Sequence, residues 1–133
     1  LVQGRSTWRI GSVEALSNPF LKADSRASRG GVSFIVKKLR QYLHGETALP
    51  GVFIDAVDSL QTLSAENDIQ TIATHQQVFE LRLLAELGYI KVTDDIQSLV
   101  HTAVIADAIG GYDTSLDGVI TKGIERASQV SHL

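Results

Sequence analysis

The chain has 133 residues, of which 44% are apolar and 20% charged, a composition typical of one soluble globular domain with a hydrophobic core. It contains no cysteine, which excludes disulfides, thiolate zinc sites, iron–sulfur clusters and cysteine nucleophiles. No apolar run approaches the ~20 residues needed to cross a bilayer, and no secretory signal pattern opens the chain. We therefore expect a cytoplasmic protein with no membrane segment.

Charge is divided unevenly along the chain, although the net charge is only −3. Residues 1–44 contain eight Lys or Arg and two acidic residues, a net charge of +6. Residues 45–133 contain four basic and thirteen acidic residues, a net charge of −9. A polyanion is attracted to the first part and repelled by the second, so this asymmetry is the main functional signal in the sequence.

The predicted elements begin with a strand segment and continue as helices. Residues 1–14 alternate and are rich in Val, Ile, Thr and Trp, which predicts one or two short strands. The first helix is predicted over residues 23–43, with a kink or break at Gly30 and Gly31. Its apolar stripe, widened by Ile35 and Tyr42, consists of Val32, Val36, Leu39 and Leu43. The second helix is predicted over residues 50–63, beginning at Pro50.

Three further helices are predicted in the acidic part of the chain. The third has Asn67 as its N-cap and Gly88 after its last turn, and its segment 79–87 is apolar around most of its circumference, which marks a central helix. The fourth is predicted as one helix from residue 93 or 94 to Ile109, ended by two glycines, and the fifth begins with Thr114 as its cap. We expect a mainly α protein: a bundle of about five helices over residues 15–133, preceded by the β segment 1–14.

The sequence offers no pattern for catalysis. The four histidines, which lack the spacing of a helical metal site, are His44, His75, His101 and His132. No phosphate-binding glycine loop and no nucleophile elbow is present. We therefore expect no enzyme activity, no cofactor and no metal.

Basic residues gather on the first predicted helix. At 100° per residue, five of them fall within an arc of about 80° if the helix continues through its glycines: Lys22, Arg26, Arg29, Lys37 and Arg40. Asp24 is the only carboxylate between residues 15 and 45, so ion pairs within the helix do not explain these charges. Contact with phosphates explains these charges better, and the alternative is that they form a solvated helix face.

The strand segment adds to the basic part of the chain. Arg5 and Arg9 contribute two charges, and Trp8 lies between them. An exposed Trp8 would stack on an unpaired base, whereas a core position for this single Trp is an equal alternative. The predicted nucleic-acid-binding set is therefore Arg5, Trp8, Arg9, Lys22, Arg26, Arg29, Lys37 and Arg40.

The order of elements and one segment resemble a known family. The segment Gly4-Arg5-Ser6-Thr7-Trp8-Arg9-Ile10 is followed by a basic-to-apolar helix and a Pro-led helix. Residues 79–89 then read Phe-Glu-Leu-Arg-Leu-Leu-Ala-Glu-Leu-Gly-Tyr. Together they resemble the DNA repair protein RecO family over roughly residues 3–90, and residues 79–89 are the most specific match.

The resemblance implies a recombination mediator. RecO proteins have an N-terminal OB-fold and a helical domain, so residues 1–14 correspond to the end of the OB-fold or a linker and residues 15–133 to the helical domain. The chain begins with Leu1 and not Met, so we expect a fragment or a processed chain that lacks an upstream domain. The resemblance implies that the family's OB-fold is absent from this chain. The family binds single- and double-stranded DNA, promotes strand annealing and, with RecR, helps to load the recombinase onto DNA coated by single-strand-binding protein. It cleaves no bond.

Two family features bear on the expected site. Many relatives carry a four-cysteine zinc module after the segment that ends at Tyr89, and residues 90–133 contain no cysteine. The family's helical domain also receives the acidic, Phe-ending tail of single-strand-binding protein, which needs an apolar pocket beside basic groups. On charge and adjacency we assign this role to Lys37, Lys38, Leu39, Arg40 and Leu43.

Two other interpretations remain open, and a third is weaker. The chain is alternatively a helical protein–protein interaction adaptor without nucleic-acid binding, whose basic stripe meets an acidic partner. It is alternatively part of an enzyme whose catalytic residues come from another domain. A helix-turn-helix reader of base sequence is disfavoured, because no compact helix pair ends in a polar recognition face.

Overall fold

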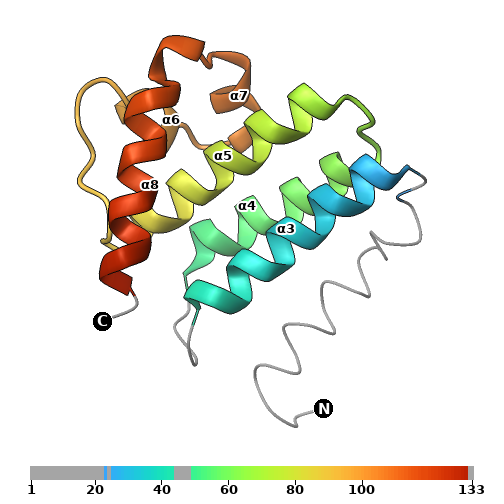
Figure 1. Ribbon diagram of the computed structural model, residues 1–133, viewed down its shortest axis with the longest axis horizontal. Helices are drawn as coiled ribbons and strands as arrows, with labels where there is room; N and C mark the ends of the chain where they lie inside the picture. Colours follow the sequence, from blue (N-terminus) through green and yellow to red (C-terminus); the bar gives the residue numbers. More distant parts are fainter. Residues whose placement is uncertain (1–22, 24, 44–48, 132–133) are drawn as a thin grey trace, which may run out of the picture.

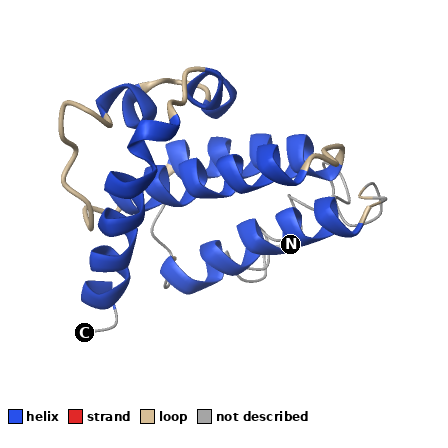
Figure 2. Cartoon of the chain, turned by 45° about the horizontal axis from the view of Figure 1, so that its top comes forward, coloured by secondary structure: helices blue, strands red, loops and turns tan. Residues whose placement is uncertain are grey.

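A computed structural model of the chain describes residues 23, 25–43 and 49–131 (Figure 1). Their elements are α3 (Arg26–Tyr42), α4 (Pro50–Ser64), α5 (Ile69–Glu86), α6 (Gln97–His101), α7 (Ile105–Gly110), the 3₁₀ turn η1 (Thr114–Leu116) and α8 (Asp117–Ser131). These residues contain helices and no strand (Figure 2), which confirms the mainly α prediction. The predicted β segment 1–14 lies outside the described residues.

Helix α5 is the centre of the fold. It contacts α3 and α4 on one side, and α6, α7 and α8 gather toward its other side (Figure 1). Its apolar residues from Val78 to Leu84 are buried, and Phe79 is 1% exposed. Helix formation places apolar side chains from this segment on several faces at once, so that both layers of helices pack against it. The prediction of a central helix here is confirmed.

Helix α3 runs unbroken through Gly30 and Gly31, so the predicted kink or break is wrong. The helix begins at a capping box in which Ser25 and Ser28 bond to each other's backbone N–H groups. Gly31 faces the core, where a Cβ atom would lie 3.1 Å from Ile72 Cγ2. The glycine therefore allows α3 to approach α5 closely, and the packing of the two helices offsets its low helix propensity.

The ends of α4 and α5 follow their predicted signals with one exception. Pro50 occupies the first turn of α4, as predicted. The N-cap of α5 is Asp68, whose carboxylate accepts the Thr71 N–H at 2.8 Å, and not the predicted Asn67. Asp68 also accepts the Thr71 hydroxyl, an additional bond that favours this register.

Gly88 ends α5, as predicted. Its φ of 83° is the left-handed conformation that glycine adopts without strain. The Tyr89 N–H donates to the Leu84 carbonyl at 2.9 Å, and the Gly88 N–H donates to the Ala85 carbonyl at 3.1 Å. This is the pair of bonds of a Schellman motif.

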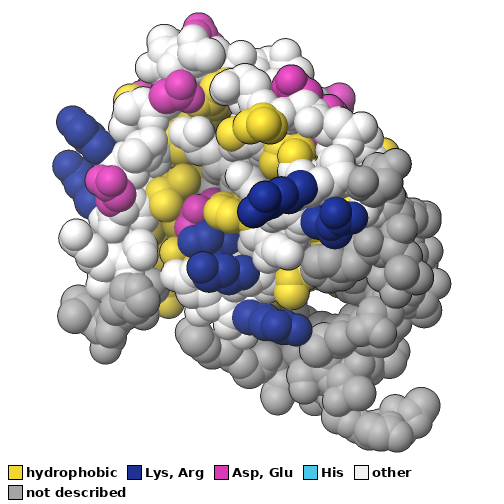
Figure 3. Space-filling model, turned by 45° about the vertical axis from the view of Figure 1, so that its right-hand side comes forward, with side chains coloured by type: hydrophobic (Ala, Val, Ile, Leu, Met, Phe, Trp, Pro, Cys, Tyr) yellow, Lys and Arg dark blue, Asp and Glu magenta, His cyan; other side chains and the backbone are white. Residues whose placement is uncertain are grey.

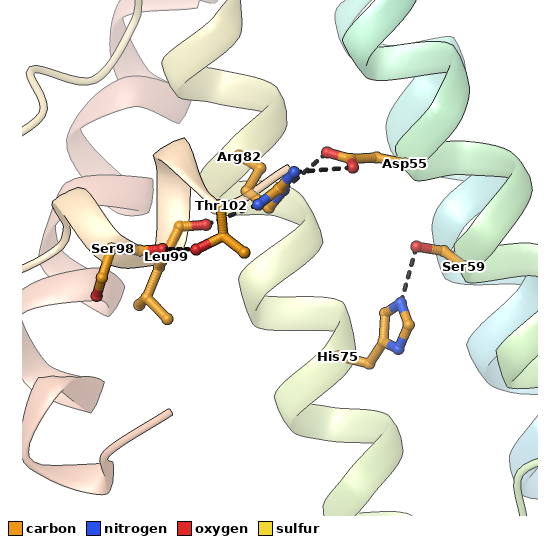
Figure 4. Close-up of polar contacts among 7 residues, drawn as sticks. All are labelled: Asp55, Ser59, His75, Arg82, Ser98, Leu99 and Thr102. Carbon is orange, nitrogen blue, oxygen red and sulfur yellow. Dashed lines mark hydrogen bonds and ion pairs between the residues drawn. The ribbon is translucent and has the colours of Figure 1, made fainter. Parts of the chain in front are cut away.

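The predicted fourth helix is two short helices, α6 and α7, separated by residues 102–104. In a continuous helix the Ser98 and Leu99 carbonyls would accept backbone N–H groups four residues ahead. The Thr102 hydroxyl donates to the Ser98 carbonyl instead, and the Arg82 guanidinium donates to the Leu99 carbonyl (Figure 4). With these acceptors occupied by side chains, the chain turns, and Ile105 enters the core on a new helix.

The predicted fifth helix begins differently from the prediction. Asp113, and not Thr114, is the cap, and its carboxylate accepts the Ser115 N–H at 2.9 Å. A 3₁₀ turn over Thr114–Leu116 then leads into α8. Ile120 and Ala127 face the core from α8, in agreement with the predicted apolar side.

Candidate nucleic-acid interface

Four cationic side chains lie on one exposed side of α3. Because the helix is continuous, the predicted arc holds for its described members, and all of them are exposed: Arg26, Arg29, Lys37 and Arg40. We call these four residues the basic face. Dark-blue side chains gather over α3 in the space-filling view (Figure 3). Lys22, Arg5, Trp8 and Arg9, which complete the predicted set, lie outside the described residues.

The basic face points away from the core. The buried residues Val32, Ile35 and Tyr42 lie on the opposite side of α3, where they pack against α4 and α5. Half-buried Val36 borders the basic face, so part of the predicted apolar stripe adjoins it. Core packing therefore fixes the rotation of α3 and holds the four cations toward solvent.

The cations of the basic face have few partners. The Arg29 guanidinium donates to the Ala23 carbonyl, a neutral acceptor, at 3.1 Å. Arg26, Lys37 and Arg40 make no ion pair or side-chain hydrogen bond with the described part of the chain. Four cations on one helix without a carboxylate partner among the described residues produce a positive potential, which attracts a polyanion.

Lys38 has a different environment from its neighbour Lys37. Its Nζ lies 3.1 Å from Glu80 Oε2 of α5 and near the rings of Phe34 and Tyr42, 5.3 and 5.8 Å from their centroids. The Tyr42 hydroxyl donates to the same Glu80 oxygen at 3.3 Å. Burial raises the pKa of Tyr42, and the Glu80 charge acts in the same direction, so this phenol stays protonated. Lys38 therefore joins α3 to α5.

The predicted docking set for a protein tail is dispersed around α3. Lys37 and Arg40 belong to the basic face, whereas Lys38 is paired with Glu80. Leu39 and Leu43 are half-buried and pack against the core. The structure thus does not bring these five side chains together on one surface.

A buried ion pair that the sequence analysis missed joins α4 to α5. Arg82 donates through Nε and Nη2 to the two carboxylate oxygens of Asp55, at 2.8 and 3.0 Å, and through Nη1 to the Leu99 carbonyl at 2.8 Å (Figure 4). Arg82 is 8% exposed and Asp55 is 7% exposed. The sequence does contain a feature that indicates this pair. Each of the two helices has a charged residue at a core-facing position, and a buried charge requires a partner.

A second polar contact crosses the same two helices. His75 Nε2 lies 2.8 Å from the Ser59 hydroxyl, and both side chains are buried (Figure 4). Burial lowers the pKa of His75 to about 4, against the opposing charges of Asp58 and Glu66. The imidazole is therefore neutral at physiological pH. No cluster of three metal-ligating side chains occurs among the residues that the structure describes.

One small cavity lies beside the Arg82–Asp55 pair. Its volume is about 70 Å³, and its lining includes Ile54, Glu86 and Val100. Pockets that enclose a small-molecule ligand usually measure at least about 300 Å³. This cavity is therefore too small for a nucleotide.

Comparison of the chain with known protein families, curated proteins and solved structures gives no match. Among the described helices, none is long and apolar enough to cross a membrane. The basic face is the feature of the described chain that bears most directly on function.

Proposed function

We propose that the chain binds nucleic acid through phosphate contacts of the basic face and serves as the helical domain of a recombinational DNA repair mediator. In this role it contacts DNA and single-strand-binding protein, and together with RecR it supports strand annealing and recombinase loading. The single observation that carries the proposal is the basic face: four exposed cations on one side of α3 that form no ion pair with any carboxylate of the described residues. Such a surface is the electrostatic footprint of a phosphate-binding protein.

The distribution of acidic residues supports one orientation on a polyanion. Exposed carboxylates occur beyond α5 and along α6 to α8, at Asp94, Asp95, Asp107, Asp113, Asp117 and Glu125. They belong to the layer opposite α3 in the fold (Figure 1). A nucleic acid is thus attracted to the α3 side and repelled from the far side, which orients the encounter.

The resemblance to RecO supports the mediator role more specifically than charge does. The segment Phe79–Tyr89, which carries the likeness, forms the buried second half of α5 and its Schellman end. A helix in this position organises the packing of the domain. The resemblance thus lies in the scaffold, while the proposed DNA contacts lie on α3.

The test is fluorescence anisotropy of labelled DNA against the 133-residue chain, titrated with salt. The variant Arg26→Glu/Lys37→Glu/Arg40→Glu leaves Arg29 and its bond to Ala23 intact. Its matched control is Lys91→Glu/Lys122→Glu/Arg126→Glu, which makes the same charge change at three other exposed cations. We expect the loss of DNA affinity in the first variant to be at least ten times the loss in the control. For the unmodified chain, the logarithm of the affinity should fall with the logarithm of the salt concentration with a slope of about −3.

Equal losses in both variants would show that net charge alone drives binding and would overturn the assignment to α3. Absence of binding by the unmodified chain at low salt would remove the nucleic-acid function. Circular dichroism of each variant checks that the helices remain.

A second candidate is the protein–protein adaptor, and one observation favours it. Phe53 and Ile54 near the start of α4 are 39% and 53% exposed, and Ile54 borders the cavity beside Arg82. Exposed apolar side chains of this size are common at protein interfaces. If the unmodified chain binds single-strand-binding protein but binds no DNA at any salt concentration, the adaptor is favoured over the first proposal.

A further inference from the structure

The basic face consists of two pairs of cations with a gap between them. Arg26 and Arg29 form the first pair, and Lys37 and Arg40 form the second. A helix rises 1.5 Å per residue, so the centres of the pairs are about 17 Å apart along α3. The arrangement therefore presents two separate phosphate-binding points and not one continuous row.

The gap between the pairs carries only short side chains. Ser33 lies at the middle of the arc and is exposed, and Gly30 lies at its edge with open space around the position of a Cβ atom. Arg, Asn and Gln are the side chains that most often read base edges, and none of them occupies this gap. Contacts made here depend on the phosphate backbone and carry little base specificity.

The described part of α3 also offers no open aromatic ring beside its cations. Tyr42 is buried, and Phe34 is half-buried with the Lys38 ammonium 5.3 Å from its ring centroid. Proteins that prefer single strands combine a basic groove with aromatic side chains on which unpaired bases stack. The described part of α3 thus has the cations without the stacking platform.

We infer that the basic face binds the backbone of a nucleic-acid duplex, independently of base sequence, with its two cation pairs on phosphates of opposite strands across one groove. This inference rests on the proposed nucleic-acid function and narrows it to one form of the ligand. The major groove is about 12 Å wide, and adding the radii of the bordering phosphates gives a separation of roughly 18 Å between phosphate centres. This span matches the separation of the cation pairs.

The decisive variant moves one cation without changing the net charge. Ser33→Lys/Lys37→Ser shifts a charge by about 6 Å along the same exposed side, toward the first pair, and closes the gap. Two single variants are the matched controls. Ser33→Ala measures the effect of losing the hydroxyl, and Lys37→Ser measures the effect of losing one charge, so that the effect of the changed spacing can be separated from both. Ser33 and Lys37 are both exposed, so we expect these substitutions to preserve the fold.

The measurement is anisotropy with one DNA strand and its duplex, labelled identically and titrated at the same salt concentration, together with a second duplex of unrelated sequence. We expect the duplex to bind about tenfold more tightly than the single strand, and the two duplexes to bind within about threefold of each other. The spacing variant should lose about fivefold in duplex affinity and keep its single-strand affinity. Ser33→Ala should bind like the unmodified chain.

The outcomes separate this inference from the proposed function. Binding of single strand and duplex with equal affinity, or a spacing variant that keeps full duplex affinity, would overturn the duplex assignment. The proposed function would still stand in that case, provided that the triple Glu variant of the basic face loses binding. No binding of either form of DNA by the unmodified chain would overturn both.

Discussion

Arg82 and Asp55 form a bidentate ion pair that is buried between α5 and α4, with Nε–Oδ2 and Nη2–Oδ1 distances of 2.8 and 3.0 Å. The third bond of the guanidinium, to the Leu99 carbonyl, extends the same contact to α6. One side chain thus holds three helices in register. Because a buried charge without a partner is costly, neither residue can be removed alone without penalty.

Arg82→Met is therefore expected to lower the free energy of unfolding by about 3–5 kcal/mol. The variant leaves the Asp55 carboxylate buried without a partner and removes the donor to the Leu99 carbonyl. Urea denaturation followed by circular dichroism measures the change. The double variant Arg82→Met/Asp55→Leu should recover much of the loss, since no charge then remains buried. A single variant as stable as the exposed control Lys122→Met would contradict the role of the pair.

The two glycines of α3 provide a matched pair. Gly30→Ala should raise the free energy of unfolding by up to about 1 kcal/mol, because alanine favours the helix and nothing lies within 4 Å of the new Cβ. Gly31→Ala gains the same helix propensity but places its Cβ 3.1 Å from Ile72 Cγ2 and 3.5 Å from Leu63 Cδ1. We expect it to be less stable than Gly30→Ala by at least about 1 kcal/mol. Equal stabilities in chemical denaturation would show that α3 and α5 do not pack as closely as described.

The sequence predicted the long helices well because their signals are local. Apolar spacing located α3, α4 and α5, and the positions of Pro50 and Gly88 agree with the observed ends. The exposed basic face was also predictable, because an amphipathic helix places its charged residues opposite its apolar ones. These features depend on residues within one turn or two of each other.

The errors came from contacts between residues far apart in the chain. The continuity of α3 through Gly31 depends on Ile72, which lies on another helix. The division between α6 and α7 depends on Arg82, which takes the carbonyl of Leu99. Helix periodicity contains no information about such partners, so the sequence alone predicted a break where there is none and a continuous helix where there are two.

His75 predicts a loss of stability in acid. Its pKa is about 4 in the folded chain, against 6.5 for the ordinary imidazole, because burial disfavours the charged form. The unfolded state therefore binds the proton first as the pH falls. The stabilising effect of the neutral imidazole is complete above pH 6.5 and is lost progressively toward pH 4, with a total of up to about 3 kcal/mol.

The measurement is the free energy of unfolding as a function of pH for the unmodified chain and for His75→Gln. The variant should lack the component that falls between pH 6.5 and 4, while carboxylates contribute equally to both proteins. His101→Gln, at an exposed position, controls for the loss of one histidine. If the profiles of the unmodified chain and His75→Gln remained parallel, the imidazole would not be buried in its neutral form.

Two adjacent lysines of α3 should separate binding from stability. Lys38→Ala removes the ion pair with Glu80 and the contacts with Phe34 and Tyr42, so it should lower the free energy of unfolding by about 1 kcal/mol. Its effect on DNA affinity should be small, because Glu80 already compensates its charge. Lys37→Ala removes an exposed cation of the basic face, so it should change stability by less than about 0.5 kcal/mol and lower duplex affinity several-fold.

The two variants have the same net charge, and nonspecific attraction therefore affects both equally. Urea denaturation and anisotropy on the same preparations give the two readouts, and similar losses of DNA affinity in both variants would mean that the basic face is not the binding surface.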